Sequence, residues 1–82
     1  MFKKRSVSLS GHATSVALEP EFWAVLDTAA RDKAIPFAQL IARIDAARSA
    51  TQPSQPLSSA CRVFALAYVQ NEDGAPLAII ET

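Results

Sequence analysis

The feature that most constrains the fold is a short strand that runs directly into a helix. Residues 12–18 alternate, and period two with β-branched residues is typical of a half-buried strand. The segment Glu19-Pro20-Glu21 follows at once and favours a helix start, because proline suits the first helical position and carboxylates suit the positive end of the helix dipole. Such a short strand is not stable unpaired, so it needs a partner strand.

A second alternating run precedes this strand. Val7 and Leu9 share one side of residues 6–10, and Gly11-His12 then interrupts the pattern. Two interpretations stay open: a hairpin about Gly11-His12, for which a Gly-X pair is compatible with a type II′ turn, or one irregular ribbon. We take residues 12–18 as the main strand. Its outward face is then formed by Ala13, Ser15 and Ala17, and its inward face by Thr14, Val16 and Leu18.

Three helices are expected after the strand. The first carries an apolar stripe and ends near Arg31-Asp32-Lys33; the second begins at or near Pro36; the third runs from a capping Ser58 to about Gln70. Residues 49–56 form a polar connector. The apolar stripe of the first helix contains Phe22, Val25, Leu26, Ala29 and Ala30. Trp23 lies at the edge of this stripe, and we expect the body of its indole to be buried and the edge of its indole to be exposed. The apolar stripe of the second helix contains Phe37, Leu40, Ile41, Ile44 and Ala47.

The end of the chain gives weaker signals. Residues 71–74 predict a turn, and residues 77–80 are a short apolar run that is compatible with an added strand. Asp45 and Arg62 lie beside the apolar faces of the second and third helices, and we expect a structural ion pair between them. Cys61 shares a face with Phe64 and Tyr68, which favours a buried hydrophobe over a reactive thiol.

These elements resemble a known group, the short bacterial ribbon-helix-helix proteins of the Arc/MetJ-like fold. The resemblance spans most of residues 4–69. It rests on Lys4-Arg5-Ser6, Gly11-His12, Thr14-Ser15-Val16-Ala17-Leu18-Glu19, Phe22-Trp23, Leu40-Ile41, Ile44-Asp45, Ser58-Ser59-Ala60 and Arg62-Val63-Phe64. What it implies is fold and dimerisation, with DNA binding by analogy.

The resemblance implies a mainly α fold with one short strand. Two copies would form an intertwined homodimer whose strands pair antiparallel as an intermolecular two-stranded ribbon, followed by the third, C-terminal helix. The expected organisation is a basic arm (1–11), a ribbon-helix-helix core (12–50), a connector with the third helix (51–70) and a tail (71–82). The expected dimer core is Val16, Leu18, Phe22, Trp23, Leu26, Leu40, Ile41 and Ile44.

Composition supports association. The chain has 82 residues, half of them hydrophobic, and so small a domain leaves much apolar surface wet when it stands alone. The formal net charge is zero but uneven: residues 1–18 hold three basic side chains and no acidic one, whereas residues 19–82 hold five basic and eight acidic ones. A basic arm of this kind indicates either an anionic partner or a solvated tail.

Catalytic and metal chemistry find no support. One histidine, one cysteine and two glycines give no zinc cluster, no hydrolytic motif and no phosphate-cradling loop, so we expect neither an enzyme nor a cofactor. No run approaches a membrane span and the N-terminus lacks the apolar block of a signal peptide, which favours a cytoplasmic protein.

The leading functional prediction is a dimeric DNA-binding transcription regulator whose ribbon enters the major groove. The expected DNA-binding residues are Lys3, Lys4, Arg5, His12, Ala13, Ser15 and Ala17. The ribbon face departs from the wider fold, because alanine cannot make the bidentate contacts that identify a base. The alternative is a protein-interaction module, antitoxin-like or an assembly adaptor, that uses the third helix and the C-terminal apolar segment.

Overall fold

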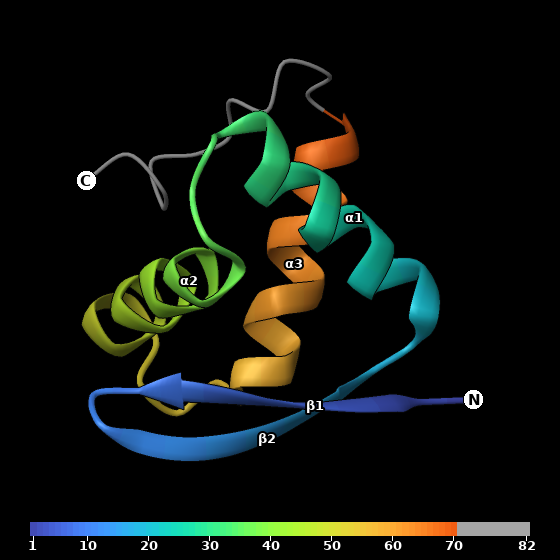
Figure 1. The fold of residues 1–82 in the computed structure, drawn as a ribbon. Helices are drawn as coiled ribbons and strands as arrows, with labels where there is room; N and C mark the ends of the chain where they lie inside the picture. The colour runs from blue at the N-terminus through green and yellow to red at the C-terminus, as the bar shows by residue number, and fades with distance from the viewer. Residues whose placement is uncertain (71–82) are drawn as a thin grey trace.

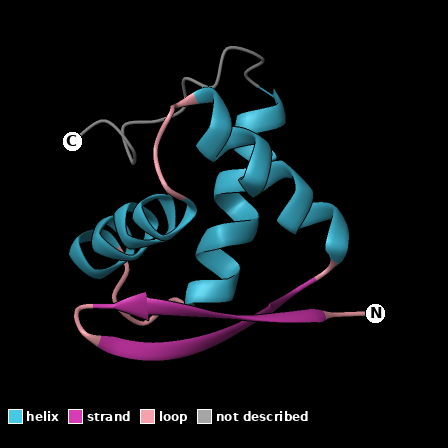
Figure 2. Ribbon diagram, viewed as in Figure 1, coloured by secondary structure: helices cyan, strands magenta, loops and turns pink. Residues whose placement is uncertain are grey.

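The computed structural model describes residues 1–70 as a β-hairpin covered on one face by three helices (Figure 1). The strands are β1 (Lys3–Leu9) and β2 (His12–Leu18), and the helices are α1 (Pro20–Asp32), α2 (Phe37–Thr51) and α3 (Leu57–Gln70). Figure 2 shows the two layers, with the hairpin on one side and all three helices on the other. The expectations for residues 71–74 and 77–80 fall outside the described residues.

The ribbon is formed within one chain. β1 pairs antiparallel with β2, from Lys3 opposite Leu18 to Leu9 opposite His12. The expected single strand is therefore two strands, and the partner of β2 in this ladder is β1 instead of β2 from a second copy. The physical reason is that the first alternating run supplies a partner that needs no second molecule. Of the two interpretations of residues 6–18, the hairpin is the observed one.

The hairpin turn lies one residue earlier than the type II′ interpretation placed it. Its central residues are Ser10 and Gly11, with φ of 52° and 84°. Two successive positive φ values define a type I′ turn, whose twist matches that of the flanking strands. A Cβ added at Gly11 would meet nothing within 4 Å, so glycine serves backbone conformation there, not close packing.

Helix α1 ends in a hydrogen-bonded cap. The N–H of Ala34 donates to the carbonyl of Arg31 and the N–H of Ile35 to that of Ala30, which is the Schellman arrangement. Ala34 occupies the left-handed position of this cap, with φ of 56°, where glycine is usual. Pro36 then precedes α2, so the predicted end of the first helix and start of the second are both confirmed.

The core lies between the hairpin and the helices. Val7 and Val16 contribute from the strands, α3 packs against both other helices, and Phe64 is the largest fully buried side chain. The core residues are Val7, Val16, Leu18, Trp23, Leu26, Ala29, Ala30, Leu40, Ile41, Ile44, Ala60, Cys61, Phe64, Ala65 and Tyr68. Trp23 is fully in the core, whereas Phe22 is half-buried, the reverse of the expectation from the stripe. The burial predicted for Cys61 is confirmed.

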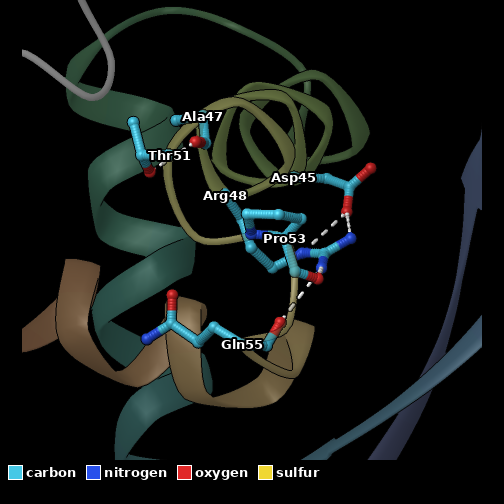
Figure 3. A network of polar contacts seen from close by, with 6 residues as sticks. All are labelled: Asp45, Ala47, Arg48, Thr51, Pro53 and Gln55. Atoms are coloured by element: carbon cyan, nitrogen blue, oxygen red, sulfur yellow. Dashed lines mark hydrogen bonds and ion pairs between the residues drawn. The ribbon is translucent and has the colours of Figure 1, made fainter.

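The connector after α2 is held by Arg48. Its guanidinium donates to the carbonyls of Pro53 and Gln55 at 3.1 and 3.0 Å, and the Asp45 carboxylate accepts from it at 2.6 Å (Figure 3). The expected Asp45–Arg62 ion pair is therefore wrong: Arg62 bonds Glu19 instead, at 3.0 Å. Arg48 is one helical turn from Asp45, so it reaches that carboxylate first.

The connector is also shorter than predicted. Helix α2 continues to Thr51, whose hydroxyl donates to the carbonyl of Ala47. Helix α3 begins at Leu57, where the N–H of Ala60 already donates to the carbonyl of Pro56. Ser58 is therefore inside the first turn and does not cap the helix, because the preceding proline starts it.

Candidate nucleic-acid interface

The hairpin has one face turned away from the helices, which we call the outer ribbon face. Directly opposed residues of an antiparallel ladder lie on the same face. This face therefore consists of three cross-strand pairs, Lys4–Ala17, Ser6–Ser15 and Ser8–Ala13. Ala17 is half-buried and the other five residues are exposed. The face is small, and Lys4 is its one charged residue.

The outer ribbon face contains three of the residues predicted to bind DNA: Ala13, Ser15 and Ala17. The structure brings Lys4 to the same face, beside Ala17. Sequence periodicity indicated the alanine and serine side of β2 correctly. It did not indicate the matching residues Ser6 and Ser8 of β1, because their place on this face depends on the register between the strands.

Lys3 and Lys4 are both exposed at the start of β1. They line a shallow hollow of about 370 Å³ beside the start of α1, together with Arg5, Pro20, Trp23, Ala24 and Asp27. The Lys3 backbone is fixed, since its carbonyl accepts a hydrogen bond of 2.8 Å from the Trp23 indole. The predicted basic arm is thus the first strand of the ribbon, with its lysines at a defined place.

Arg5 lies on the inner side of the hairpin, opposite Val16. Its two terminal nitrogens donate to the two carboxylate oxygens of Asp27, each at 3.0 Å. Its guanidinium also lies over the rings of Trp23 and Phe37, at 4.7 and 5.1 Å. The hydrogen bonds from Arg5 hold the pKa of the Asp27 carboxyl below its usual range. Arg5 therefore has a structural partner, and we leave it out of the interface.

His12 lies at the turn end of the hairpin, exposed and opposite Leu9. Its register puts it on the inner side, away from Ser15 and Lys4. Thr14 is likewise on the inner side, half-buried and opposite Val7. The structure therefore separates His12 from the outer ribbon face.

The expected dimer-core residues are already packed within one chain. Seven of the eight are buried in the single-chain core, and Phe22 is half-buried. Truncation of Leu26 or Ile44 would therefore remove packing inside one chain, whether or not a second copy is bound.

The second edge of β2 carries unpaired backbone groups. In a hairpin with a two-residue loop, the pair flanking the loop is hydrogen-bonded and the pairs then alternate. The N–H and carbonyl groups of His12, Thr14, Val16 and Leu18 thus point toward β1. Those of Ala13, Ser15 and Ala17 point to the outer edge of β2, where a further strand can add.

Charge is unevenly distributed along the chain, whose formal net charge is zero. Residues 1–70 contain eight basic and five acidic side chains, a net charge of +3, and the three remaining acidic residues belong to residues 71–82. Three of the basic residues, Arg5, Arg48 and Arg62, form ion pairs with Asp27, Asp45 and Glu19. By register, Lys4 lies on the outer ribbon face, and Lys3 is exposed one residue before it.

Helix α3 exposes an apolar surface that the sequence showed only as a second apolar side. Val63, Leu66 and Val69 are each more than half exposed.

Among residues 1–70, no helix is both long and apolar enough to cross a membrane. The same residues contain no group of three or more His, Cys, Asp and Glu side chains placed to hold a metal ion.

Comparison with known proteins agrees with this geometry. The model of the ribbon-helix-helix domain family matches residues 2–69. An uncharacterized protein from Bordetella pertussis Tohama I has a similar solved structure, with 33% sequence identity and a TM-score of 0.76. The similarity covers 96% of this chain and 66% of that one, so this chain spans just under two thirds of its relative. No curated protein matches the sequence. The chain belongs to the ribbon-helix-helix domain family.

Proposed function

We propose that this protein is a dimeric DNA-binding transcription regulator that places its outer ribbon face against the major groove. Ribbon-helix-helix domains are in general DNA-binding regulators, and this chain belongs to that family. The observation that carries the proposal is the outer ribbon face itself: an exposed face of two paired strands that carries Lys4, with Lys3 exposed one residue before it on the inner side. The two β2 strands at the centre of the dimer proposed below would form a two-stranded ribbon, which fits the width of the major groove.

The contacts with DNA would come mainly from phosphates. Serine and alanine make no bidentate base contacts, so the ribbon would lie close to the base edges while Lys3 and Lys4 reach the backbone. Affinity should then fall steeply with salt, because each neutralised phosphate releases counterions. Such a regulator would act in the bacterial cytoplasm and need no cofactor.

Dimerisation would use the outer edge of β2. A second copy would add antiparallel, with the two-fold axis beside Ser15. The Ser15 N–H of each copy would then donate to the Ser15 carbonyl of the other. Two β2 strands would lie at the centre, with the β1 strands and their lysines outside them. This arrangement keeps the intermolecular ribbon expected from the sequence and adds a flanking strand on each side.

The DNA test is a salt series on random-sequence duplex DNA. The Lys3→Ala/Lys4→Ala variant should bind more weakly, and the salt dependence should flatten by roughly 0.9 for each phosphate that the variant no longer neutralises. Arg31→Ala is the control, since Arg31 is exposed in the last turn of α1. That end of α1 lies away from the hairpin (Figure 1). Absence of binding at low salt, or an equally weakened affinity in both variants, would refute the proposal.

The dimer test uses two matched prolines. Ser15→Pro removes an N–H from the outer edge of β2, whereas Ser6→Pro removes the equivalent N–H from the outer edge of β1, directly across the ladder. Neither change removes a bond between β1 and β2. Ser15→Pro should lower the mass in sedimentation, because it removes the contact through β2, and Ser6→Pro should leave the mass unchanged. Equal masses for both variants and wild type would exclude the β2 edge.

A second candidate function is a protein-interaction module, antitoxin-like or an assembly adaptor. The exposed apolar side chains Val63, Leu66 and Val69 favour it, because a small domain seldom exposes a row of large apolar side chains on a helix without a partner. A Leu66→Glu variant that loses a bound protein while keeping DNA affinity would support this function.

A further inference from the structure

The exposed side of α3 carries a continuous apolar row, which we call the α3 ridge: Val63, Leu66 and Val69. Their exposed fractions are 55%, 54% and 52%. The three residues are spaced by three, so they are neighbours in a row that is inclined to the helix axis. The opposite side of α3 is buried against the hairpin and the other helices. The ridge is therefore left exposed by the core that residues 1–70 form.

The ridge has no net charge to select a charged partner. Arg62 is the one ionisable residue with a charge at neutral pH in α3, and its guanidinium donates to the Glu19 carboxylate at 3.0 Å. The same guanidinium lies over the rings of Phe2 and Phe22, at 5.6 and 5.8 Å. Phe2 is itself exposed and contacts α3 through Arg62. A charged peptide or nucleic acid would gain nothing on this surface, whereas a neutral apolar surface would.

The ridge is symmetric about Leu66. Val63 and Val69 lie three residues to either side, Ala65 and Ala67 one residue, and Arg62 and Gln70 four. In an antiparallel pair of helices with a two-fold axis at Leu66, each valine meets a valine and Leu66 meets its own copy. Arg62 then faces Gln70, so a guanidinium meets an amide that can accept a hydrogen bond, and no like charges face each other.

We infer that the α3 ridge binds the α3 ridge of a second copy of this chain, antiparallel and centred on Leu66. The surface is distinct from the outer ribbon face and from the β2 edge, so one chain can make all three contacts. Copies paired through β2 would be joined by α3 into larger assemblies. This inference does not depend on DNA binding, and it gives the exposed third helix a partner of the same sequence.

The first test measures mass by sedimentation over a concentration series. It compares wild type with Leu66→Glu and with Ala42→Glu, which adds the same charge at an exposed position of α2. Leu66→Glu should weaken self-association by roughly tenfold or more, because it places two carboxylates at the two-fold axis. Ala42→Glu should behave as wild type. Near-ultraviolet circular dichroism of Trp23 verifies that each variant is folded.

The same series is repeated in the Ser15→Pro background. In that background the β2 edge cannot pair, so a dimer that remains must use another surface. If adding Leu66→Glu dissociates this dimer, the dimer is held by the α3 ridge. A wild-type mass that equals the Leu66→Glu mass at every concentration, in both backgrounds, would overturn the inference, and the α3 ridge would then be assigned to a different protein.

A disulfide test fixes the geometry. Cys61 is the chain's one cysteine and is buried, so it gives little background. Leu66→Cys should cross-link to itself. In this register Val63 meets Val69 of the copy, so a mixture of Val63→Cys and Val69→Cys proteins should form the mixed disulfide faster than either variant cross-links to itself. Ala42→Cys is the control and should remain monomeric by non-reducing electrophoresis. A Leu66→Cys protein that cross-links no faster than Ala42→Cys would exclude the antiparallel arrangement centred on Leu66.

Discussion

Arg5 on β1 and Asp27 on α1 form a bidentate ion pair, with both N–O distances at 3.0 Å, and the Arg5 guanidinium lies over the Trp23 ring. The pair joins the first strand to a helix that begins eleven residues after that strand ends. Arg5→Ala should lower the free energy of unfolding by about 1 kcal/mol, since the side chains are 39% and 36% exposed and solvent weakens the ion pair. Urea unfolding followed by Trp23 fluorescence measures this. Lys4→Ala, on the other face, should cost nearly nothing, and equal effects would contradict the assignment.

The same pair gives an acid-sensitive contribution to stability. Hydrogen bonds from Arg5 lower the pKa of Asp27, so the stabilisation is present above the unfolded pKa of about 3.9 and is lost as pH falls through the folded pKa. Asp27→Asn should be less stable than wild type at neutral pH, and the difference should shrink as the pH falls through the folded pKa of Asp27. The midpoints of urea unfolding of both proteins, measured from neutral to acidic pH, check the prediction. A stability difference between the two proteins that does not change with pH would show that the pKa of Asp27 is not lowered by folding.

Ala34 occupies a position that suits glycine. With φ of 56° in the cap of α1, it pays a steric cost that glycine avoids. Ala34→Gly should therefore stabilise the chain by ~0.5–1 kcal/mol. Ala42→Gly, at an exposed position inside α2, should destabilise it by a similar amount. The two midpoints of thermal unfolding should shift in opposite directions, and a decrease in both would refute the strain at residue 34.

Tyr68 gives an alkaline limit. Burial, and then the hydrogen bond from its hydroxyl to Asp32, raise the pKa of Tyr68 to about 12. The unfolded pKa is about 10, so its stabilisation is complete below about pH 10 and is lost as pH rises toward about 12. It is the chain's one tyrosine, so tyrosinate absorbance reports it directly. If Tyr68 in the folded protein titrated near its unfolded pKa of about 10, the hydrogen bond to Asp32 would be contradicted.

Cys61 should be unreactive in the folded chain. It is buried, and burial raises the pKa of its thiol to about 12, so almost no thiolate is present at neutral pH. Modification by a thiol-specific disulfide reagent should proceed only when the chain opens. The rate should therefore increase in Leu26→Ala, which weakens core packing, and stay unchanged in Lys4→Ala. Rapid modification of the wild type would show that the thiol is accessible.

Local signals were sufficient for the helices. Pro20 and Pro36 stand at the starts of the first two helices, and the polar stretch before Leu57 separates the third, so three helices could be predicted with small errors at their ends. The buried residues of α2 also followed from spacing alone. The family resemblance added the overall fold, which periodicity could not provide.

Contacts between distant segments were not predictable in this way. The partner of Arg5 is 22 residues away, and nothing in the local pattern at Lys3-Lys4-Arg5 distinguishes a free arm from a strand. Trp23 is buried instead of Phe22 because its indole reaches the Lys3 carbonyl, which depends on the hairpin. The outer ribbon face was half predictable: alternation indicated Ala13, Ser15 and Ala17, and the register with β1 determined the rest.

The in-chain hairpin has a kinetic consequence. Strands joined by a two-residue turn meet through the shortest loop closure available, so the ribbon can form early in folding, in a first-order step. A ribbon made from two separate molecules would form in a second-order step and would be missing at low concentration. A newly synthesised copy of this chain can therefore complete its ribbon, with the Ser6–Ser15 face already assembled, before it meets another copy.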